Sequence, residues 1–278
     1  MEPICDLHIH STFSDGTDTP TQLIDLASAA GLSAVALCDH NTVAGLPELI
    51  AAAQGREVEA VPGVEFSTEY LGTELHILGL FIRPEHYGAV TEVLDAMLLR
   101  KEQSNRALVE ALKKADIHVD YTAIKAHASG NVNRALIAAE MVRLGYCGSV
   151  KEAFSKWLSP KRGYYQPPKR LDAFEAIRFI KSIGATAVLA HPFLNLDEEA
   201  LRVFLKTAKE CGLDAIEAHY SMFTPAQTAL ARQIAEEFDL KISGGSDYHG
   251  SNKPHIQIGK GQGDLRVSME LLEQLRPV

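Results

Sequence analysis

The amino-acid sequence predicts an α/β protein, a distorted (β/α)7 barrel interrupted by a helical insert. Short apolar segments alternate with segments of helical periodicity in residues 1–99 and again in 169–278. Polar residues rich in histidine follow most of the apolar segments, which is where barrel enzymes place their chemistry. Residues 100–168 have helical periodicity and no strand pattern, so we expect them to form the insert, a cap for a substrate.

The first part of the barrel is predicted from apolar runs and helix signals. Thr19-Pro20 provides a helix N-cap followed by proline at the first helical position, and apolar residues then recur at helical spacing up to Gly31. The turn Leu71-Gly72-Thr73 separates two strand-like arms and predicts a hairpin. The expected order is strand 4–9, helix 20–30, strand 33–38, helix 46–53, strand 58–61 and hairpin 66–80.

The insert and the second part of the barrel follow. A long helix or a broken pair is expected between Val90 and Leu112, with shorter helices over 136–144 and 150–158. A loop rich in proline and glycine, 159–168, ends the insert. Thereafter we expect helix 172–183, strand 186–190, helix 197–211, strand 215–218, a helix after Pro225 and strand 241–243.

Composition bounds the class of protein. With 278 residues, 46% hydrophobic and 23% charged, the chain is typical of a globular protein in water, and its net charge of −9 argues against broad binding to a nucleic-acid backbone. No apolar run reaches a membrane span, and Met1-Glu2-Pro3 does not resemble a secretory signal, so we expect a cytoplasmic protein that does not bind membranes. The cysteines lack metal spacing and are expected to be free thiols, most of them buried: Cys5, Cys38, Cys147 and Cys211.

Histidines gather at the predicted strand ends. His8 and His10 share one face of an extended strand and could hold a metal ion together, although an isolated H-x-H also fits an edge strand. Asp39, beside His40, is expected to orient an imidazole rather than to bind metal. Seven of the eleven histidines lie at such ends or in the hairpin: His8, His10, His40, His76, His191, His219 and His249. The others are expected at the surface or at caps: His86, His118, His127 and His255.

The order of these motifs resembles the PHP (polymerase and histidinol phosphatase) family. The resemblance rests on His8-x-His10-Ser11, Ser14-Asp15-Gly16, Asp39-His40-Asn41, Gly63-Val64-Glu65, His76, His191-Pro192 and Asp247-x-His249. It covers nearly the whole chain and is closest to the stand-alone phosphoesterases, which include nucleoside 3',5'-bisphosphate phosphatases and short-oligonucleotide ribonucleases. It implies a distorted seven-stranded barrel with two or three divalent metal ions. Imidazole and carboxylate ligands suit Mn, Zn or Fe.

The resemblance also implies a ligand set. The first metal would be held by His8, His10, Glu65 and Asp247, the second by Glu65, His76 and His191, and the third by Asp15, His40 and His249. Glu65 would bridge two ions. Taken singly, His76 fits a core histidine and His191 a strand terminus.

Substrate contacts are expected from the insert. Arg134 resembles the family's arginine that binds substrate phosphate, but Ala135 and Leu136 stand where the family usually has proline and histidine. Lys161, Arg162 and Tyr165 lie in the loop that covers the site in relatives, where a solvated loop is the alternative. His219 is not needed as a ligand and is assigned to phosphate contact or proton transfer to the leaving group.

Together these features predict a metal-dependent phosphatase or phosphodiesterase. A hydroxide bridging two metals would attack phosphorus, with Glu65, Asp247 and His219 as the catalytic residues. The expected substrate is a small phosphorylated metabolite: a nucleotide bisphosphate, a short oligonucleotide end or a sugar cyclic phosphate. Two alternatives stay open, an amidohydrolase on the same kind of metal cluster and a non-catalytic interaction module. The sequence does not fix the oligomeric state.

Overall fold

The structure is a computed structural model that describes residues 2–127 and 132–277. The chain divides into two compact units, Met1–Thr91 with Leu171–Val278, and Glu92–Arg170. The predicted insert, residues 100–168, falls inside the second unit. Its role as a cap over the substrate stays a prediction.

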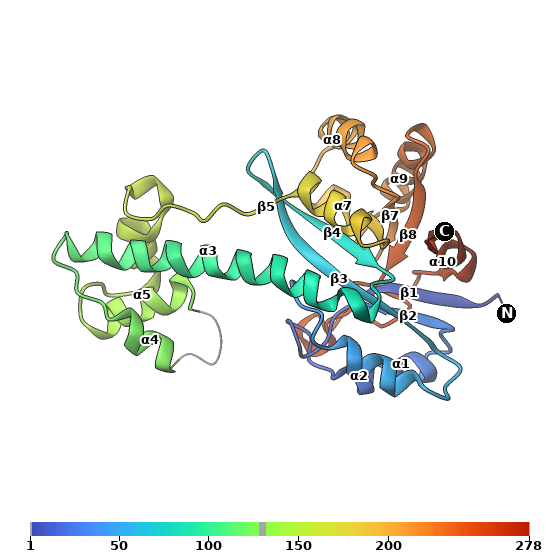
Figure 1. Cartoon of the computed structure of the whole chain (residues 1–278), viewed down its shortest axis with the longest axis horizontal. Helices are drawn as coiled ribbons and strands as arrows, with labels where there is room; N and C mark the ends of the chain where they lie inside the picture. The colour runs from blue at the N-terminus through green and yellow to red at the C-terminus, as the bar shows by residue number, and fades with distance from the viewer. Residues whose placement is uncertain (1, 128–131, 278) are drawn as a thin grey trace. The chain divides into compact units, whose positions relative to one another are not determined.

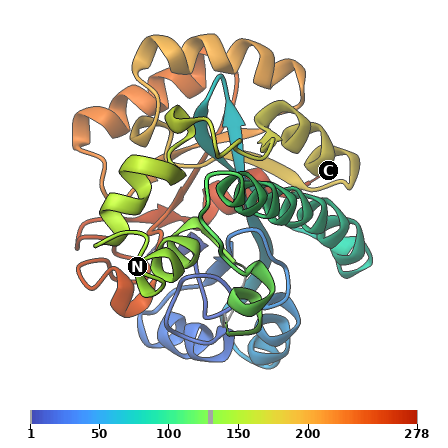
Figure 2. The same cartoon turned by 90° about the vertical axis from the view of Figure 1, so that its left-hand side faces the viewer.

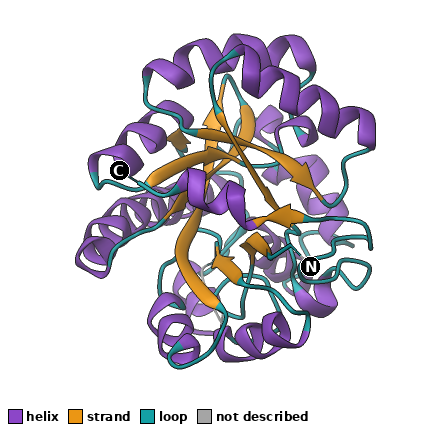
Figure 3. Ribbon diagram, turned by 90° about the vertical axis from the view of Figure 1, so that its right-hand side faces the viewer, coloured by secondary structure: helices purple, strands orange, loops and turns teal. Residues whose placement is uncertain are grey.

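The first unit is a distorted barrel built on one mixed sheet (Figure 1, Figure 3). Among the described residues this sheet has nine strands, and neighbours follow the order β8-β7-β6-β4-β3-β2-β1-β9, with β5 paired to β3. The seven longer strands are those of the predicted barrel, and β5 and β9 are two-residue additions. The strands are β1 (Ile4–Ile9), β2 (Ala34–Leu37), β3 (Glu59–Tyr70), β4 (Thr73–Leu80), β5 (Leu171–Asp172), β6 (Thr186–Leu189), β7 (Ala215–Tyr220), β8 (Lys241–Gly245) and β9 (Val267–Ser268).

Backbone hydrogen bonds close the barrel between β1 and the segment after β8. The Asp247 N–H donates to the His8 carbonyl at 2.8 Å, and the His10 N–H donates to the Tyr248 carbonyl at 2.9 Å. Gly245 permits this approach, because a Cβ at this position would lie 2.6 Å from the backbone nitrogen of His8. The carboxyl ends of β1 and β8, with their histidines and aspartate, are therefore held side by side.

The hairpin differs from the prediction in its first arm. The strands expected at 58–61 and 66–70 are one continuous strand, β3, which runs through Pro62 and Gly63. Its first half pairs with β2 in parallel, and its second half pairs with β4 in the antiparallel sense. Gly63 does not break the strand, because it serves close packing: a Cβ there would lie 2.9 Å from the Leu37 carbonyl oxygen.

Helices cover the outside of the barrel. Figure 2 shows α8 and α9, in orange, on one side of the strands and α1 and α2, in blue, on the other. Helix α1 begins as predicted, with a capping box between Thr19 and Gln22 and proline at its first position. The helices are α1 (Pro20–Ala29), α2 (Leu46–Ala53), α7 (Ala173–Ser182), α8 (Glu198–Glu210), α9 (Pro225–Glu237) and α10 (Met269–Leu275), with short turns η1 (Pro84–His86), η4 (Pro192–Leu194) and η5 (Gly250–Asn252).

The second unit is helical and has its own hydrophobic core. The long apolar pattern forms one helix, α3, rather than a broken pair. Leu108, Leu112, Ile137 and Met141 are fully buried in a cluster within the unit. Its helices are α3 (Tyr87–Lys113, which begins in the first unit), α4 (Tyr121–His127), α5 (Arg134–Arg143) and α6 (Val150–Ala153), followed by the π-helical turn η2 (Phe154–Leu158) and the 3-10 turn η3 (Pro160–Arg162).

Two further expectations concern the thiols and the membrane. Cys5, Cys38 and Cys147 are buried free thiols, and Cys211 is a free thiol that is partly exposed. None of the helices in 2–127 and 132–277 is long and apolar enough to cross a membrane.

Candidate metal centre

All nine predicted metal ligands come together at the carboxyl ends of the barrel strands and in the hairpin. They form overlapping groups whose donor atoms lie within 4.8 Å of one another. Because the groups share members, the nine side chains make one continuous cluster. The groups are His10, Asp15, His40 and His249; His8, Glu65 and His191; His8, His10 and Asp247; and His40, Glu65 and His76.

Glu65 is the centre of this cluster. Its Oε1 lies 2.8 Å from Nδ1 of His76 and 3.1 Å from Nε2 of His191. Its Oε2 lies 3.2 Å from Nε2 of His8, 3.3 Å from Nε2 of His10 and 3.0 Å from Nδ1 of His40. The two oxygens thus face different sets of imidazoles, which is the arrangement of a carboxylate that bridges two cations.

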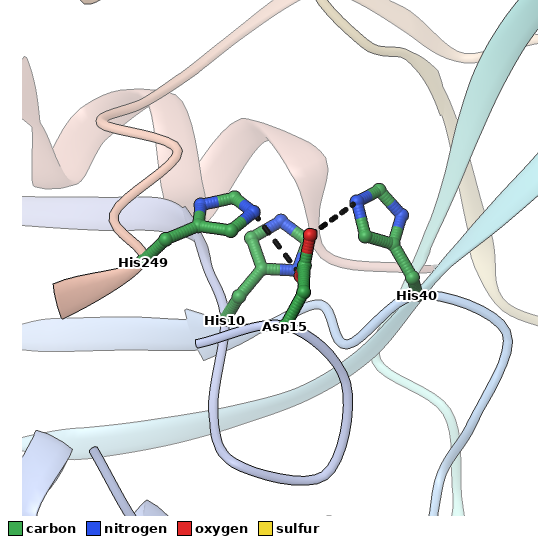
Figure 4. Close-up of side chains that lie close together, drawn as sticks. All are labelled: His10, Asp15, His40 and His249. Atoms are coloured by element: carbon green, nitrogen blue, oxygen red, sulfur yellow. Dashed lines mark ion pairs between the residues drawn. The ribbon is translucent and has the colours of Figure 1, made fainter. Parts of the chain in front are cut away.

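Asp15 lies among His10, His40 and His249 (Figure 4). It comes from the loop after β1, and its side chain is about half exposed. One oxygen lies 3.2 Å from Nε2 of His249 and 3.8 Å from Nδ1 of His10, and the other lies 3.8 Å from Nε2 of His40. Burial would raise the pKa of Asp15, but the hydrogen bond from His249 and the charge of His40 lower it to about 2.

The donor atoms fit a divalent metal. Ligands at about 2.1 Å from one metal ion lie about 3.0–3.4 Å from each other, close to the separations around Glu65. Several of these atoms are buried and have no hydrogen-bond partner in the described structure, which is costly unless an ion binds them. They are Nε2 of His8, both ring nitrogens of His10, Nδ1 of His40 and Oε2 of Glu65. Imidazole and carboxylate together suit Zn, Mn or Fe.

The pKa shifts of the cluster are also consistent with metal binding. Burial would raise the pKa of Glu65, but the charges of His8 and His76 hold it well below the usual value. Burial would lower the pKa of His76, and Glu65 raises it to about 9. Burial lowers the pKa of His40 to about 4, so this ring is neutral at pH 7 and ready to bind metal.

Two buried carboxylates that were not predicted as site residues form hydrogen bonds with the candidate ligands or with the segments that carry them. Glu217 on β7 has its Oε1 3.1 Å from Nδ1 of His8, and its Oε2 accepts the backbone N–H of His191 at 2.7 Å. Asp6 on β1 accepts the backbone N–H groups of Ser246 and Gly259 at 2.8 and 2.7 Å. Both carboxylates are fully buried. Glu217 fixes the ring of His8 and the backbone of His191, and Asp6 fixes the backbone that follows β8.

Asp39 corrects a prediction. Instead of orienting an imidazole, it accepts hydrogen bonds from the N–H and hydroxyl of Ser11, at 2.7 and 2.6 Å, and from the hydroxyl of Ser14 at 2.6 Å. Its carboxylate thus shapes the loop that carries Asp15. The loop glycine, Gly16, has no room for a side chain, since a Cβ would lie 2.7 Å from the carbonyl carbon of His10.

Two of the candidate ligands have unusual backbone conformations. His191 has φ 29° and Asp247 has φ 56°, in the positive region that costs free energy for residues other than glycine. Each stands two residues after the end of a barrel strand. The backbone N–H of His191 donates to the Glu217 carboxylate, and that of Asp247 donates to the His8 carbonyl. Such strain, maintained at the candidate ligands, is typical of functional sites.

His219 does not join the cluster. A register shift in β7 between Glu217 and His219 changes the faces of the following residues, and Tyr220 instead donates its hydroxyl to Oδ2 of Asp247 at 2.8 Å. Burial and the charge of Arg232 lower the pKa of His219. His219 belongs to none of the groups of closely spaced donor atoms found among the described residues. The predicted role of His219, phosphate contact or proton transfer to the leaving group, does not require a place among the metal ligands and stays a prediction.

The predicted substrate residues of the insert make contacts within the second unit. Arg134 donates to the Leu158 carbonyl at 3.1 Å, and its guanidinium lies 4.2 Å from the centre of the Tyr165 ring. Arg162 donates to the Ser155 carbonyl at 2.6 Å, and Lys161 is exposed in η3. Tyr165 is buried in the core of the unit. Their contacts with a substrate stay predictions.

The sequence analysis missed Asp6, Glu217, Tyr220 and Lys253. Lys253 donates from Nζ to Oδ2 of Asp247 at 2.6 Å. Glu217 had a signal, because a charged residue inside an otherwise apolar strand is seldom buried without a partner. Tyr220 and Lys253 had no such signal in the sequence. The bulge in β7 directs Tyr220 to Asp247, and the loop after β8 directs Lys253 to it.

Comparison with known proteins identifies the family. A model of the PHP domain matches residues 6–165. The chain belongs to the PHP family. It is 35% identical over 274 residues to the 5'-3' exoribonuclease of Haemophilus influenzae, which covers 98% of this chain and 97% of that protein. It is 28% identical over 279 residues to the 3',5'-nucleoside bisphosphate phosphatase of Chromobacterium violaceum, covering 98% of this chain and 94% of that protein. The predicted resemblance to stand-alone PHP proteins is confirmed.

A solved structure agrees with the fold. The crystal structure of a proposed metal-dependent phosphoesterase from Bifidobacterium adolescentis superposes with a TM-score of 0.69 at 27% identity, covering all of this chain and 98% of that one. The predicted distorted barrel is therefore confirmed, with β4 as an antiparallel member that the simple (β/α) pattern does not contain.

Proposed function

We propose that this PHP protein is a metal-dependent phosphoesterase that acts on the phosphate ends of nucleotides or short RNA. The observation that carries the proposal is Glu65, whose two oxygens face two different sets of imidazoles. Relatives of nearly full length include an exoribonuclease and a nucleoside bisphosphate phosphatase, which share phosphate-ester hydrolysis on a nucleotide. A sugar cyclic phosphate remains as the competing substrate.

The residues that would hold metal ions are the nine of the cluster. Divalent ions at such a centre supply a water nucleophile at neutral pH and stabilise negative charge on the phosphoryl group. Other residues of the chain position these side chains. Glu217 fixes the ring of His8 and the backbone of His191. Asp39 fixes the loop that carries Asp15. The burial of His8, His10 and Glu65 keeps bulk water from competing for their donor atoms.

The test is a substrate panel with the metal-loaded protein. Manganese-loaded enzyme should hydrolyse a 5'-phosphorylated RNA oligonucleotide and adenosine 3',5'-bisphosphate, and should leave amide substrates intact. Glu65→Gln should lose at least about a hundredfold of the rate, since a neutral amide cannot bridge two cations. Glu59→Gln is the matched control, because Glu59 lies on the same strand and pairs with Arg276 at 2.8 Å, outside the cluster.

The possible failures separate the alternatives. Hydrolysis of amides but not of phosphate esters would replace the proposal with an amidohydrolase. A protein that takes up no Mn, Zn or Fe and hydrolyses nothing would be an interaction module. Equal rates for Glu65→Gln and Glu59→Gln would remove Glu65 from the centre of the site.

A further inference from the structure

The two oxygens of Asp247 have different surroundings. Oδ1 faces the imidazoles, 3.3 Å from Nε2 of His10 and 3.4 Å from Nδ1 of His249. Oδ2 faces two other donors, the hydroxyl of Tyr220 at 2.8 Å and Nζ of Lys253 at 2.6 Å. Both of these distances are those of good hydrogen bonds, and the one to lysine is charge-assisted. One oxygen is thus turned to the cluster, and the other is already occupied.

The two donors reach Asp247 from different parts of the barrel. Tyr220 ends β7, where the bulge turns its ring to the cluster, and it is buried. Lys253 follows η5. Its side chain is 33% exposed, and its ammonium group contacts the carboxylate of Asp247. Asp247 itself is held by the hydrogen bond from its N–H to His8. The carboxylate is therefore fixed by its backbone and by two side chains.

This arrangement limits how the carboxylate can bind a metal ion. A carboxylate binds metal through one oxygen or through both, and binding through both fills an additional position in the metal's shell. A catalytic metal must keep an open position for water or substrate. Donors that occupy Oδ2 oppose the two-oxygen mode, since binding through both oxygens would break two hydrogen bonds, one of them to a cation.

We propose that Tyr220 and Lys253 are positioning residues of the metal centre, which restrict Asp247 to binding metal through Oδ1 alone. The proposal rests on the proposed function, because it assumes that the cluster binds divalent ions. Neither residue is a ligand and neither needs to touch the substrate. Their effect passes through the orientation of Asp247.

The test measures manganese binding as well as turnover. Metal-depleted wild type, Tyr220→Phe, Lys253→Met and Lys253→Arg are titrated with Mn²⁺ by calorimetry, and kcat and KM are then measured at saturating Mn²⁺. Tyr220→Phe and Lys253→Met should each bind Mn²⁺ about 10–100-fold more weakly, the usual loss when a group that orients a ligand is removed. At saturating metal, both should lose kcat with little change in KM. Lys253→Arg, which keeps the charge and the donor, should retain most of the wild-type Mn²⁺ affinity and most of the wild-type kcat.

Two control variants match the changes made. Tyr248→Phe also removes a phenolic hydroxyl bonded to a carboxylate, Asp18 at 3.0 Å, but outside the nine residues. Lys181→Met removes a lysine whose side chain is 35% exposed and whose Nζ lies 2.7 Å from Oδ2 of Asp214. This ion pair lies at the amino end of β7. Both controls should bind Mn²⁺ as the wild type does. Thermal unfolding of all variants checks that each is folded.

Each outcome decides the proposal. Unchanged Mn²⁺ affinity in both Tyr220→Phe and Lys253→Met overturns it. Tighter binding in Lys253→Met with an unchanged kcat also overturns it for Lys253, because an ammonium group that only repels the metal would weaken binding without protecting the open position that turnover needs. A raised KM with unchanged Mn²⁺ affinity would make Lys253 a substrate contact instead. If the wild type itself binds no Mn²⁺, Zn²⁺ or Fe²⁺, the proposed function fails first, and this result is distinct from the others.

Discussion

Nδ1 of His8 lies 3.1 Å from Oε1 of Glu217, and both side chains are fully buried. The pairing leaves Nε2 of His8 directed at Glu65, 3.2 Å away. Burial would lower the pKa of His8, but the charges of Glu65 and Glu217 raise it well above the usual value. Glu217 therefore fixes the ring so that only Nε2 is available to a metal ion, and it raises the basicity of that nitrogen.

Replacing Glu217 by glutamine should weaken metal binding without removing a ligand. Glutamine keeps the size of the side chain but removes the charge that acts on His8, so we expect about 10–100-fold weaker Mn²⁺ binding. Calorimetric titration of the metal-depleted protein measures it, with Glu237→Gln as a control that loses an ion pair to Arg202 on the helical surface. Wild-type affinity in Glu217→Gln would mean that the pair serves only the fold.

The nine candidate ligands could be predicted because their positions follow from local pattern. Histidine and acidic residues stand out where an apolar strand ends, and the carboxyl ends of barrel strands meet at one face whatever the details of packing. His8 and His10 needed only the alternation of a strand to share a face. The likeness of the whole series to one family then resolved motifs that are ambiguous one at a time.

Tyr220, Lys253 and the partners of Asp39 could not be predicted, because tertiary contacts select them. One residue of register shift in β7 brings Tyr220 instead of His219 to Asp247, and a bulge of this kind has no reliable sequence signal. Asp39 stands beside His40 in sequence, yet its hydrogen bonds go to Ser11 and Ser14 across the barrel edge. For Asp39, proximity along the chain was the wrong guide.

Metal binding should release protons at neutral pH. His76 has a pKa of about 9 beside Glu65, so its ring is protonated at pH 7 in the metal-free protein and must lose the proton to bind metal. Calorimetry in two buffers of different ionisation enthalpy should give roughly one proton or more released per chain at pH 7, and less above pH 9. His76→Ala should reduce the release. Heats that do not depend on the buffer would contradict the assignment.

The same pair predicts how the stability of the metal-free protein depends on pH. The pKa of His76 is raised from 6.5 in the unfolded chain to about 9 in the folded one, so the folded state binds the proton more tightly. The stabilisation from the His76–Glu65 pair is complete below pH 6.5 and is lost as pH rises through about 9. Urea unfolding of metal-free wild type and His76→Ala between pH 6 and pH 10 measures this, and the difference between the two proteins should shrink over that range.

Gly245 should not tolerate alanine. A Cβ at this position would lie 2.6 Å from the backbone nitrogen of His8, so β1 or β8 must shift to make room. We expect Gly245→Ala to lower the free energy of unfolding by about 1–3 kcal/mol or more and to weaken Mn²⁺ binding, because His8 would move with β1. Gly88→Ala is the control, since a Cβ there meets nothing within 4 Å. Equal stability of the two variants would show that the strands adapt without cost.

Arg134 should determine whether a second phosphate is preferred. A charge-assisted contact between its guanidinium and a phosphate remote from the cleaved bond would be worth about 1.5–3 kcal/mol, or roughly ten- to a hundredfold in kcat/KM. Arg134→Ala should therefore lose the preference for adenosine 3',5'-bisphosphate over adenosine 3'-monophosphate. The family's histidine is replaced by Leu136, so the wild type should also hydrolyse the bisphosphate less well than its relatives do, which favours a five-membered cyclic phosphate as a competing substrate.

The structure adds a condition to this experiment, because Arg134 also stabilises the second unit. Its bond to the Leu158 carbonyl and its stacking on Tyr165 are lost in Arg134→Ala, so thermal unfolding must accompany the kinetics. Arg134→Lys keeps the charge and tests the planar guanidinium, and Arg143→Ala removes an exposed arginine of the same helix that pairs with Glu140. Equal losses on the bisphosphate, the monophosphate and the cyclic phosphate would mean that Arg134 contacts the reacting phosphate. No loss on any of them, with lowered thermal stability, would leave Arg134 with its contacts to Leu158 and Tyr165 alone.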